Sequence, residues 1–143
     1  MDYVDITMNN LREICEECIN NNTSNCVKTN CNVGFSIIMM EYVKKEKGKI
    51  LKEGFSLVPK EDAKYYDENK IARSIASICK LCKECNEHHT ELCIISLARK
   101  SIEGTVLKEI MLYPGNVLVY IINVAKQNKI FSDQIMEEFR KLQ

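Results

Sequence analysis

Apolar residues recur at helical spacing in two segments of the chain that lie 67 residues apart. Within each segment the apolar positions are separated by four, three and three residues, which places them on one face of a helix. The two stripes are Val4, Met8, Leu11 and Ile14, and Ile71, Ile75, Ile78 and Leu81. The pattern predicts one helix from about Asp5, as a possible N-cap, to Cys18, and another that begins at Asp67 or Glu68 and extends through Cys85.

A second helix is predicted after each of these two. The first covers 33–47 and ends at Gly48, which disfavours further helix. The other starts after Thr90 as N-cap, bends at Gly104 and ends near Pro114, because proline cannot continue a helix undisturbed. Under the same shift their apolar positions also correspond: Phe35, Met39, Met40 and Val43 match Ile102, Val106, Leu107 and Ile110.

The correspondence predicts a mainly α fold built as tandem units, each a helix, a cysteine-bearing loop and a helix. A tandem duplication explains the pattern, with chance resemblance between two helical segments as the alternative. The chain is then a single compact domain, 1–143, made of two related halves, 4–47 and 71–114, a connector, 48–66, and C-terminal helices, 116–143.

An α+β fold is the alternative. The segment 117–127 is rich in β-branched residues, and the preceding Pro114–Gly115 pair suits a turn, so that 106–124 also fits a small antiparallel hairpin. A second candidate hairpin spans 33–58. The last helix is predicted to be capped by Ser132, with an apolar face of Ile135, Met136, Phe139 and Leu142.

Composition and charge narrow the class of protein. The 143 residues are 45% hydrophobic and 28% charged, which is typical of a globular chain. Because 20 basic residues balance 20 acidic ones, the long-range field that gathers nucleic acid is missing, so nucleic-acid binding is disfavoured. An acidic N-terminus and the lack of an apolar run of about 20 residues predict no signal peptide, no membrane span and a cytoplasmic location.

The chain contains eight cysteines in two groups. In a reducing cytosol such cysteines are metal ligands or reactive thiols more often than disulfides. The first group is Cys15, Cys18, Cys26 and Cys31, and the second is Cys79, Cys82, Cys85 and Cys93. In both groups three members share the spacing C-x2-C-x7-C, so the groups predict two thiolate metal sites.

Zinc is the favoured metal, because a C-x2-C pair presents two sulfurs to one tetrahedral ion. Cys31 completes the first set of four ligands, whereas either Cys79 or His89 completes the second. His88, next to it, is expected to face solvent. In a different arrangement, Cys15 and Cys18 share a single metal with the C-x2-C pair of the second group.

Two rival interpretations stay open. The close spacing of Cys79, Cys82 and Cys85, with Cys93 beyond, resembles the cysteine run of an iron–sulfur cluster, which predicts an electron carrier or redox sensor. The second rival interpretation is a thiol-dependent enzyme or a metal-handling protein. Cys79 is also a candidate for a core residue without a ligand role. The favoured function is a non-enzymatic adaptor or regulator with structural zinc and a protein partner.

Overall fold

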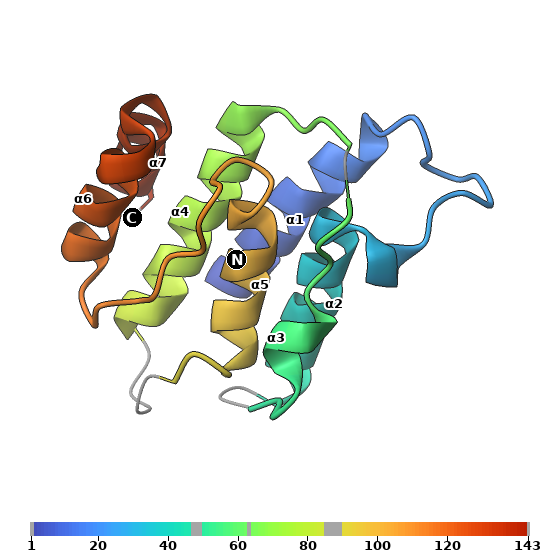
Figure 1. Ribbon diagram of the computed structural model, residues 1–143, viewed down its shortest axis with the longest axis horizontal. Coiled ribbons are helices and arrows are strands. Elements are labelled where there is room, and N and C mark those ends of the chain that lie inside the picture. Colours follow the sequence, from blue (N-terminus) through green and yellow to red (C-terminus); the bar gives the residue numbers. More distant parts are fainter. Residues whose placement is uncertain (1, 47–49, 63, 85–89, 143) are drawn as a thin grey trace.

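A computed structural model describes all residues except 1, 47–49, 63, 85–89 and 143. Its described residues form seven α-helices and one short 3-10 helix, with no strand, and so confirm the mainly α fold (Figure 1). The elements are α1 (Tyr3–Glu16), η1 (Lys28–Asn30), α2 (Asn32–Lys45), α3 (Gly54–Leu57), α4 (Glu68–Glu84), α5 (Ile94–Glu103), α6 (Val117–Gln127) and α7 (Lys129–Lys141).

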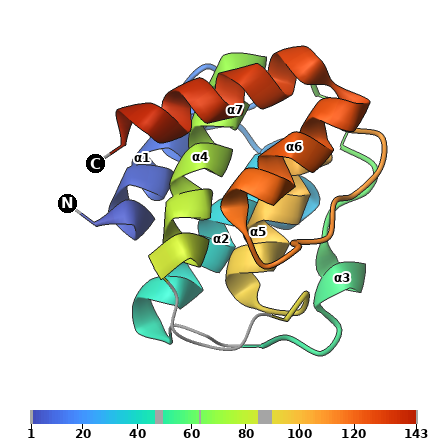
Figure 2. The ribbon, with the colours of Figure 1, turned by 90° about the vertical axis from the view of Figure 1, so that its left-hand side faces the viewer.

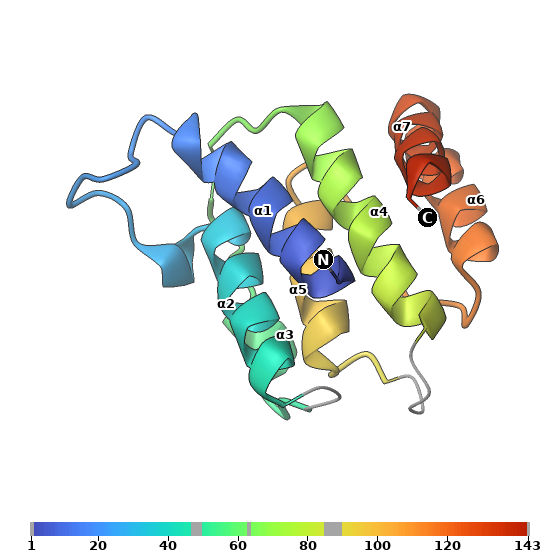
Figure 3. The ribbon, with the colours of Figure 1, turned by 180° about the vertical axis from the view of Figure 1, so that it is seen from behind.

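Four helices form an antiparallel bundle in which α1 contacts α2 and α4, and α5 completes the ring against the same two helices (Figures 1 and 3). The ion pair between Glu17 and Lys70 joins the end of α1 to the start of α4, so these two helices run in opposite directions. Between α2 and α5, Ser36 Oγ donates to the carbonyl of Ala98 at 2.7 Å. The bundle encloses the core.

The helical stripes predicted for the first helix of each half are buried in α1 and α4. The α1 cap is Asp2, whose carboxylate accepts the Asp5 amide hydrogen, so Asp5 lies inside the helix and is not its cap. Where the two helices cross, the hydroxyls of Thr7 and Ser77 lie 2.6 Å apart, and small side chains there let the backbones approach closely.

The predicted second helix of the second half is wrong beyond Glu103. Cys93 precedes α5 as its N-cap, and Thr90 instead accepts a hydrogen bond from the amide of Leu92 in the turn before the helix. The chain after α5 has no helix up to Asn116, so Val106, Leu107 and Ile110 do not match their helical counterparts. The duplication therefore stays a prediction.

Both predicted hairpins are also wrong. In 106–124, α6 occupies the segment that was expected to form the second strand, and α2 and α3 together occupy most of 33–58. Asn116 accepts the amide hydrogen of Val119 and so starts α6 despite its β-branched residues. Tyr120, Ile121 and Val124 are buried on one face, and this tertiary packing outweighs the local preference for a strand.

The final helix begins earlier than predicted. Asn128 caps α7 by accepting the amide hydrogen of Phe131. Ser132 lies inside the helix and donates to the carbonyl of Ile121 at 2.8 Å, which ties α7 to α6. As Figure 2 shows, α6 and α7 form a helical pair beside the bundle, and α7 packs across α4.

The connector between α2 and α4 returns along the bundle and carries the short helix α3 against α5 (Figure 1). Its beginning makes one isolated antiparallel bridge, between Ile50 and Cys93. Gly48, the predicted end of the helix over 33–47, lies outside the described residues. None of the described helices combines the length and apolar character needed to cross a bilayer.

Candidate metal centre

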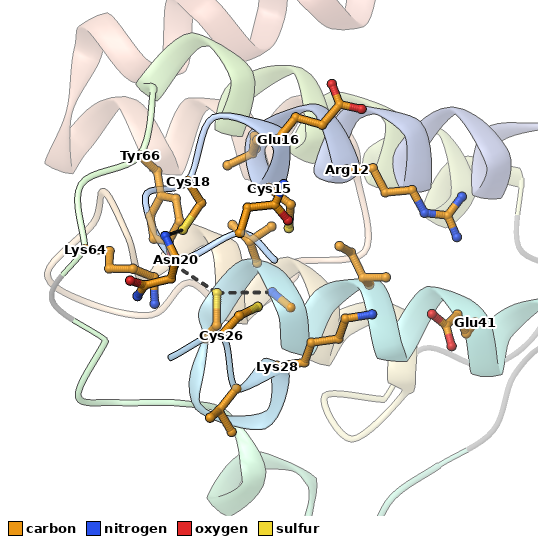
Figure 4. Close-up of a pocket in the computed structure, with 17 residues that line it drawn as sticks. Arg12, Cys15, Glu16, Cys18, Asn20, Cys26, Lys28, Glu41, Lys64 and Tyr66 are labelled. Carbon is orange, nitrogen blue, oxygen red and sulfur yellow. Dashed lines mark hydrogen bonds between the residues drawn. The ribbon is translucent and has the colours of Figure 1, made fainter. Parts of the chain in front are cut away.

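A cavity of about 320 Å³ lies where the end of α1, the following loop and the start of α2 meet (Figure 4). All four cysteines of the first predicted group line it, namely Cys15, Cys18, Cys26 and Cys31. The structure thus brings to one cavity a set of thiols that the sequence separates by up to 16 positions.

Local backbone geometry directs amide hydrogens at two of these sulfurs. A turn after α1 lets the Asn20 amide donate to Cys18 Sγ at 3.4 Å. Cys31 is the N-cap of α2, and its Sγ accepts the Gly34 amide hydrogen at 3.4 Å. Amide donors and a helix N-terminus both orient a cysteine sulfur and complement the negative charge of a metal-bound sulfur.

Cys31 has a further polar partner, from the connector. Its Sγ lies 3.1 Å from the hydroxyl oxygen of Tyr66, and Tyr66 donates its own hydrogen to Asp62. Burial raises the pKa of Tyr66, and the hydrogen bonds to Asp62 and Cys31 raise it further. Tyr66 therefore stays a neutral phenol beside the cysteine.

The charges around the cavity bear on what it can hold. Burial raises the pKa of Cys15 to about 11, and the neighbouring thiols of Cys31, Cys26 and Cys18 add to the effect. Three basic residues also line the cavity, against two acidic ones: Arg12, Lys28 and Lys64, and Glu16 and Glu41. A cation bound by the thiols would remove the mutual repulsion of their charged forms.

The sulfurs do not converge on a common point. Within the part of the chain that the structure describes, no three His, Cys, Asp or Glu side chains are close enough together to hold a metal ion. Protonated thiols are uncharged and have little attraction for one another. Closing the set requires a shift of the loop that carries Cys26, because a preformed metal site is rarely present without its ion.

Of the second predicted group, the structure describes Cys79, Cys82 and Cys93, and these three do not form a cluster that could hold a metal ion. Cys79 is 1% exposed within the apolar core, and burial raises its pKa, so it is a core residue. Cys82 lies on α4, and Cys93 precedes α5. Cys85, His88 and His89 lie outside the described residues, so a site built from them stays a prediction.

Cys82 is too far from Cys15 and Cys18 to bind the same metal ion, which was the alternative arrangement of the two C-x2-C pairs. The Glu17–Lys70 ion pair fixes the end of α1 beside the start of α4. Cys82 lies 12 residues further along α4, which is about 18 Å at 1.5 Å per residue. Because α1 and α4 are antiparallel, the last turns of these two helices lie at opposite ends of the bundle (Figure 3).

The iron–sulfur interpretation of the second group stays a prediction, because Cys85 lies outside the described residues. Its three closely spaced cysteines would need a loop that wraps around a cluster. Instead, Cys79 and Cys82 lie within the continuous helix α4, and Cys79 faces the core.

Three residues of the candidate centre were missed by sequence reasoning. They are Tyr66, Asp62 and Gly34. Tyr66 and Asp62 act through contacts with residues about 30 positions earlier in the chain, and no spacing rule reports such contacts. Gly34 acts locally, on Cys31 and Lys28. Only the glycine at the start of a predicted helix offered a signal, because glycine often marks a close backbone approach.

Replacing Gly34 by alanine is expected to lower the free energy of unfolding by about 1–3 kcal/mol. A Cβ atom there would lie 2.8 Å from the Lys28 Cα atom, so the backbone of the cysteine loop would have to move. Gly104→Ala is the matched control. Its Cβ would meet nothing closer than 3.5 Å, and its φ of −65° suits alanine, so stability should rise slightly. Urea unfolding followed by circular dichroism measures both variants, and equal effects would contradict the close packing.

No protein-family model matches this chain, and neither a curated protein nor a solved structure matches it. The function is therefore argued from its own residues.

Proposed function

We propose that this is a small metal-binding protein in which Cys15, Cys18, Cys26 and Cys31 bind one structural zinc ion. The observation that carries the proposal is that these four thiols line one cavity. Zinc prefers four sulfur ligands in tetrahedral geometry, and four protein ligands leave no open position for a substrate. The role is therefore to fix the loop between α1 and α2, and not to catalyse a reaction.

The electrostatic surroundings support a thiolate site. A zinc ion with four thiolates carries a net charge of −2, which the three basic and two acidic residues around the cavity together offset in part. The amide hydrogens from Asn20 and Gly34 already point at two of the sulfurs. Amide hydrogen bonds to a metal-bound sulfur orient the ligand and stabilise its charge.

The rival functions have less support. A thiol-dependent enzyme needs a nucleophile with a lowered pKa, whereas the pKa of Cys15 is raised to about 11 by burial and neighbouring thiols. We therefore propose that the protein is not an enzyme but a cytosolic adaptor or regulator that binds a protein partner. A second zinc site, from Cys82, Cys85, Cys93 and His89, is an extension of this proposal and is independent of the first.

The test compares Cys18→Ser with Cys79→Ala by zinc content after purification and by zinc titration against a competing chelator. Cys18→Ser should lose about one equivalent of zinc, because serine is a poor ligand for this ion. Cys79→Ala removes a thiol from the core and should keep the zinc content of the parent. The same pair can be read with Co²⁺, whose sulfur-to-metal absorption reports thiolate ligation directly.

Two results would contradict the proposal. Purified parent protein that neither contains nor binds zinc would remove the site. Equal zinc loss from Cys79→Ala and Cys18→Ser would show that the metal depends on overall stability and not on ligation by the first group.

A further inference from the structure

Tyr66 connects the candidate metal centre to a buried carboxylate in the connector. Its hydroxyl oxygen lies 3.1 Å from Cys31 Sγ and also donates a hydrogen bond to Asp62. Tyr66 approaches the cavity from the connector, on the side of Cys18 and Asn20 (Figure 4). The phenol of Tyr66 thus links Cys31, at the start of α2, to Asp62 in the connector.

Asp62 in turn ties several backbone groups together. Its carboxylate side chain is only 1% exposed and accepts the Asn32 amide hydrogen at 2.9 Å, at the start of α2. It also pairs with Lys64 at 2.9 Å. Burial works to raise the pKa of Asp62, but the hydrogen bonds from Tyr66, Asn32 and Lys64 outweigh it, and the pKa is lowered.

A phenol has a single hydrogen to donate. In the structure that hydrogen goes to Asp62, so the Cys31 thiol supplies the hydrogen of the contact between Cys31 and Tyr66. A metal-bound cysteine is a thiolate that has no hydrogen and only accepts. The contact between sulfur and phenol then persists only if Tyr66 becomes the donor.

We infer that Tyr66 is a positioning residue of the metal centre, whose hydroxyl hydrogen turns from Asp62 to the Cys31 sulfur when metal binds. The inference rests on the proposed function, since it requires metal at Cys31. It assigns a regulatory link to the site: metal occupancy removes one hydrogen bond from Asp62, which holds the connector to the start of α2. The other bonds of Asp62 keep the segment in place.

The expected consequence is a loss of metal affinity in Tyr66→Phe, which removes the donor and keeps the ring. Outer partners of metal ligands typically contribute about 10–100-fold to affinity, so a fall in that range is expected. Tyr65→Phe is the matched control, because Tyr65 is adjacent in sequence but 90% exposed. Its zinc affinity should equal that of the parent.

The experiment is a Zn²⁺ titration of the full-length parent and both variants against a competing chelator, with tyrosine absorption recorded in parallel. Zn²⁺ should perturb the near-ultraviolet tyrosine band of the parent and of Tyr65→Phe, because the phenol changes its acceptor. That perturbation should vanish in Tyr66→Phe. A merely structural role for Tyr66 would not remove a metal-dependent spectral change, and circular dichroism confirms that each variant is folded.

The outcomes separate the two proposals. If the parent binds Zn²⁺ but Tyr66→Phe binds equally well with the same spectral change, the inference is overturned and the metal site stands. If the parent does not bind Zn²⁺, both the proposed function and this inference fail. Weaker binding in both tyrosine variants would also overturn the inference, because the effect would not be specific to the Cys31 contact.

Discussion

Replacing Arg99 by alanine is expected to lower the free energy of unfolding by about 3–5 kcal/mol, since the substitution leaves a buried carboxylate without its counter-ion. Arg99 is 1% exposed and its guanidinium pairs with Glu103, which is fully buried one turn further along α5. Glu103 also accepts hydrogen bonds from Tyr120 at 2.6 Å and from the Met111 amide at 2.7 Å. These bonds hold the segment after α5, and α6, against the bundle.

Several further contacts of Arg99 would be lost at the same time. Its guanidinium donates to the Met111 carbonyl at 3.1 Å and lies 4.8 Å from the ring centre of Tyr120. The matched control is Arg140→Ala on the exposed side of α7, which should change stability by no more than about 0.5 kcal/mol. Urea unfolding followed by helical circular dichroism measures both, as the chain contains no Trp. Similar transitions for Arg99→Ala and the parent would contradict the role assigned to the buried ion pair.

Replacing Phe131 by alanine is expected to lower the free energy of unfolding by about 3–5 kcal/mol. Phe131 lies on α7, is fully buried, and belongs to the common hydrophobic core. Removing its ring leaves a cavity that the surrounding helices can close only in part.

The neighbouring residue gives a stringent control. Ile130 is 70% exposed on the same first turn of α7, so Ile130→Ala should change stability by less than about 0.5 kcal/mol. Thermal unfolding of both variants gives the comparison. A loss from Ile130→Ala as large as that from Phe131→Ala would show that this face of α7 is not oriented as described.

The sequence predicted well what depends on local spacing. The stripe from Val4 to Ile14 and the stripe from Ile71 to Leu81 are both buried in helices, because residues three and four apart share a helix face whatever surrounds them. Helix ends were less predictable. Ser132 has the right chemistry for an N-cap, yet Asn128 occupies that position and Ser132 bonds to α6 instead.

The segment 117–127 shows why a prediction from sequence can give the wrong type of secondary structure as well as the wrong boundary. Its β-branched residues favour a strand locally, but α6 buries Tyr120, Ile121 and Val124 against neighbouring helices. The burial of the Arg99–Glu103 ion pair could not be predicted from the sequence either. Charged residues are expected to be exposed unless they are paired, and the sequence alone does not show which residues pair. Both outcomes depend on residues distant in the chain.

For the candidate site, the sequence by itself determined the grouping of Cys15, Cys18, Cys26 and Cys31, which are close enough along the chain to reach one cavity. Only the tertiary structure decided that Cys79 is a core residue and that Tyr66 adjoins both Cys31 and Asp62. It also decided that Cys82 lies at the opposite end of the bundle from Cys15 and Cys18. The reason is physical: spacing fixes which side chains share a helix face, whereas the direction in which packed helices run fixes which distant residues meet.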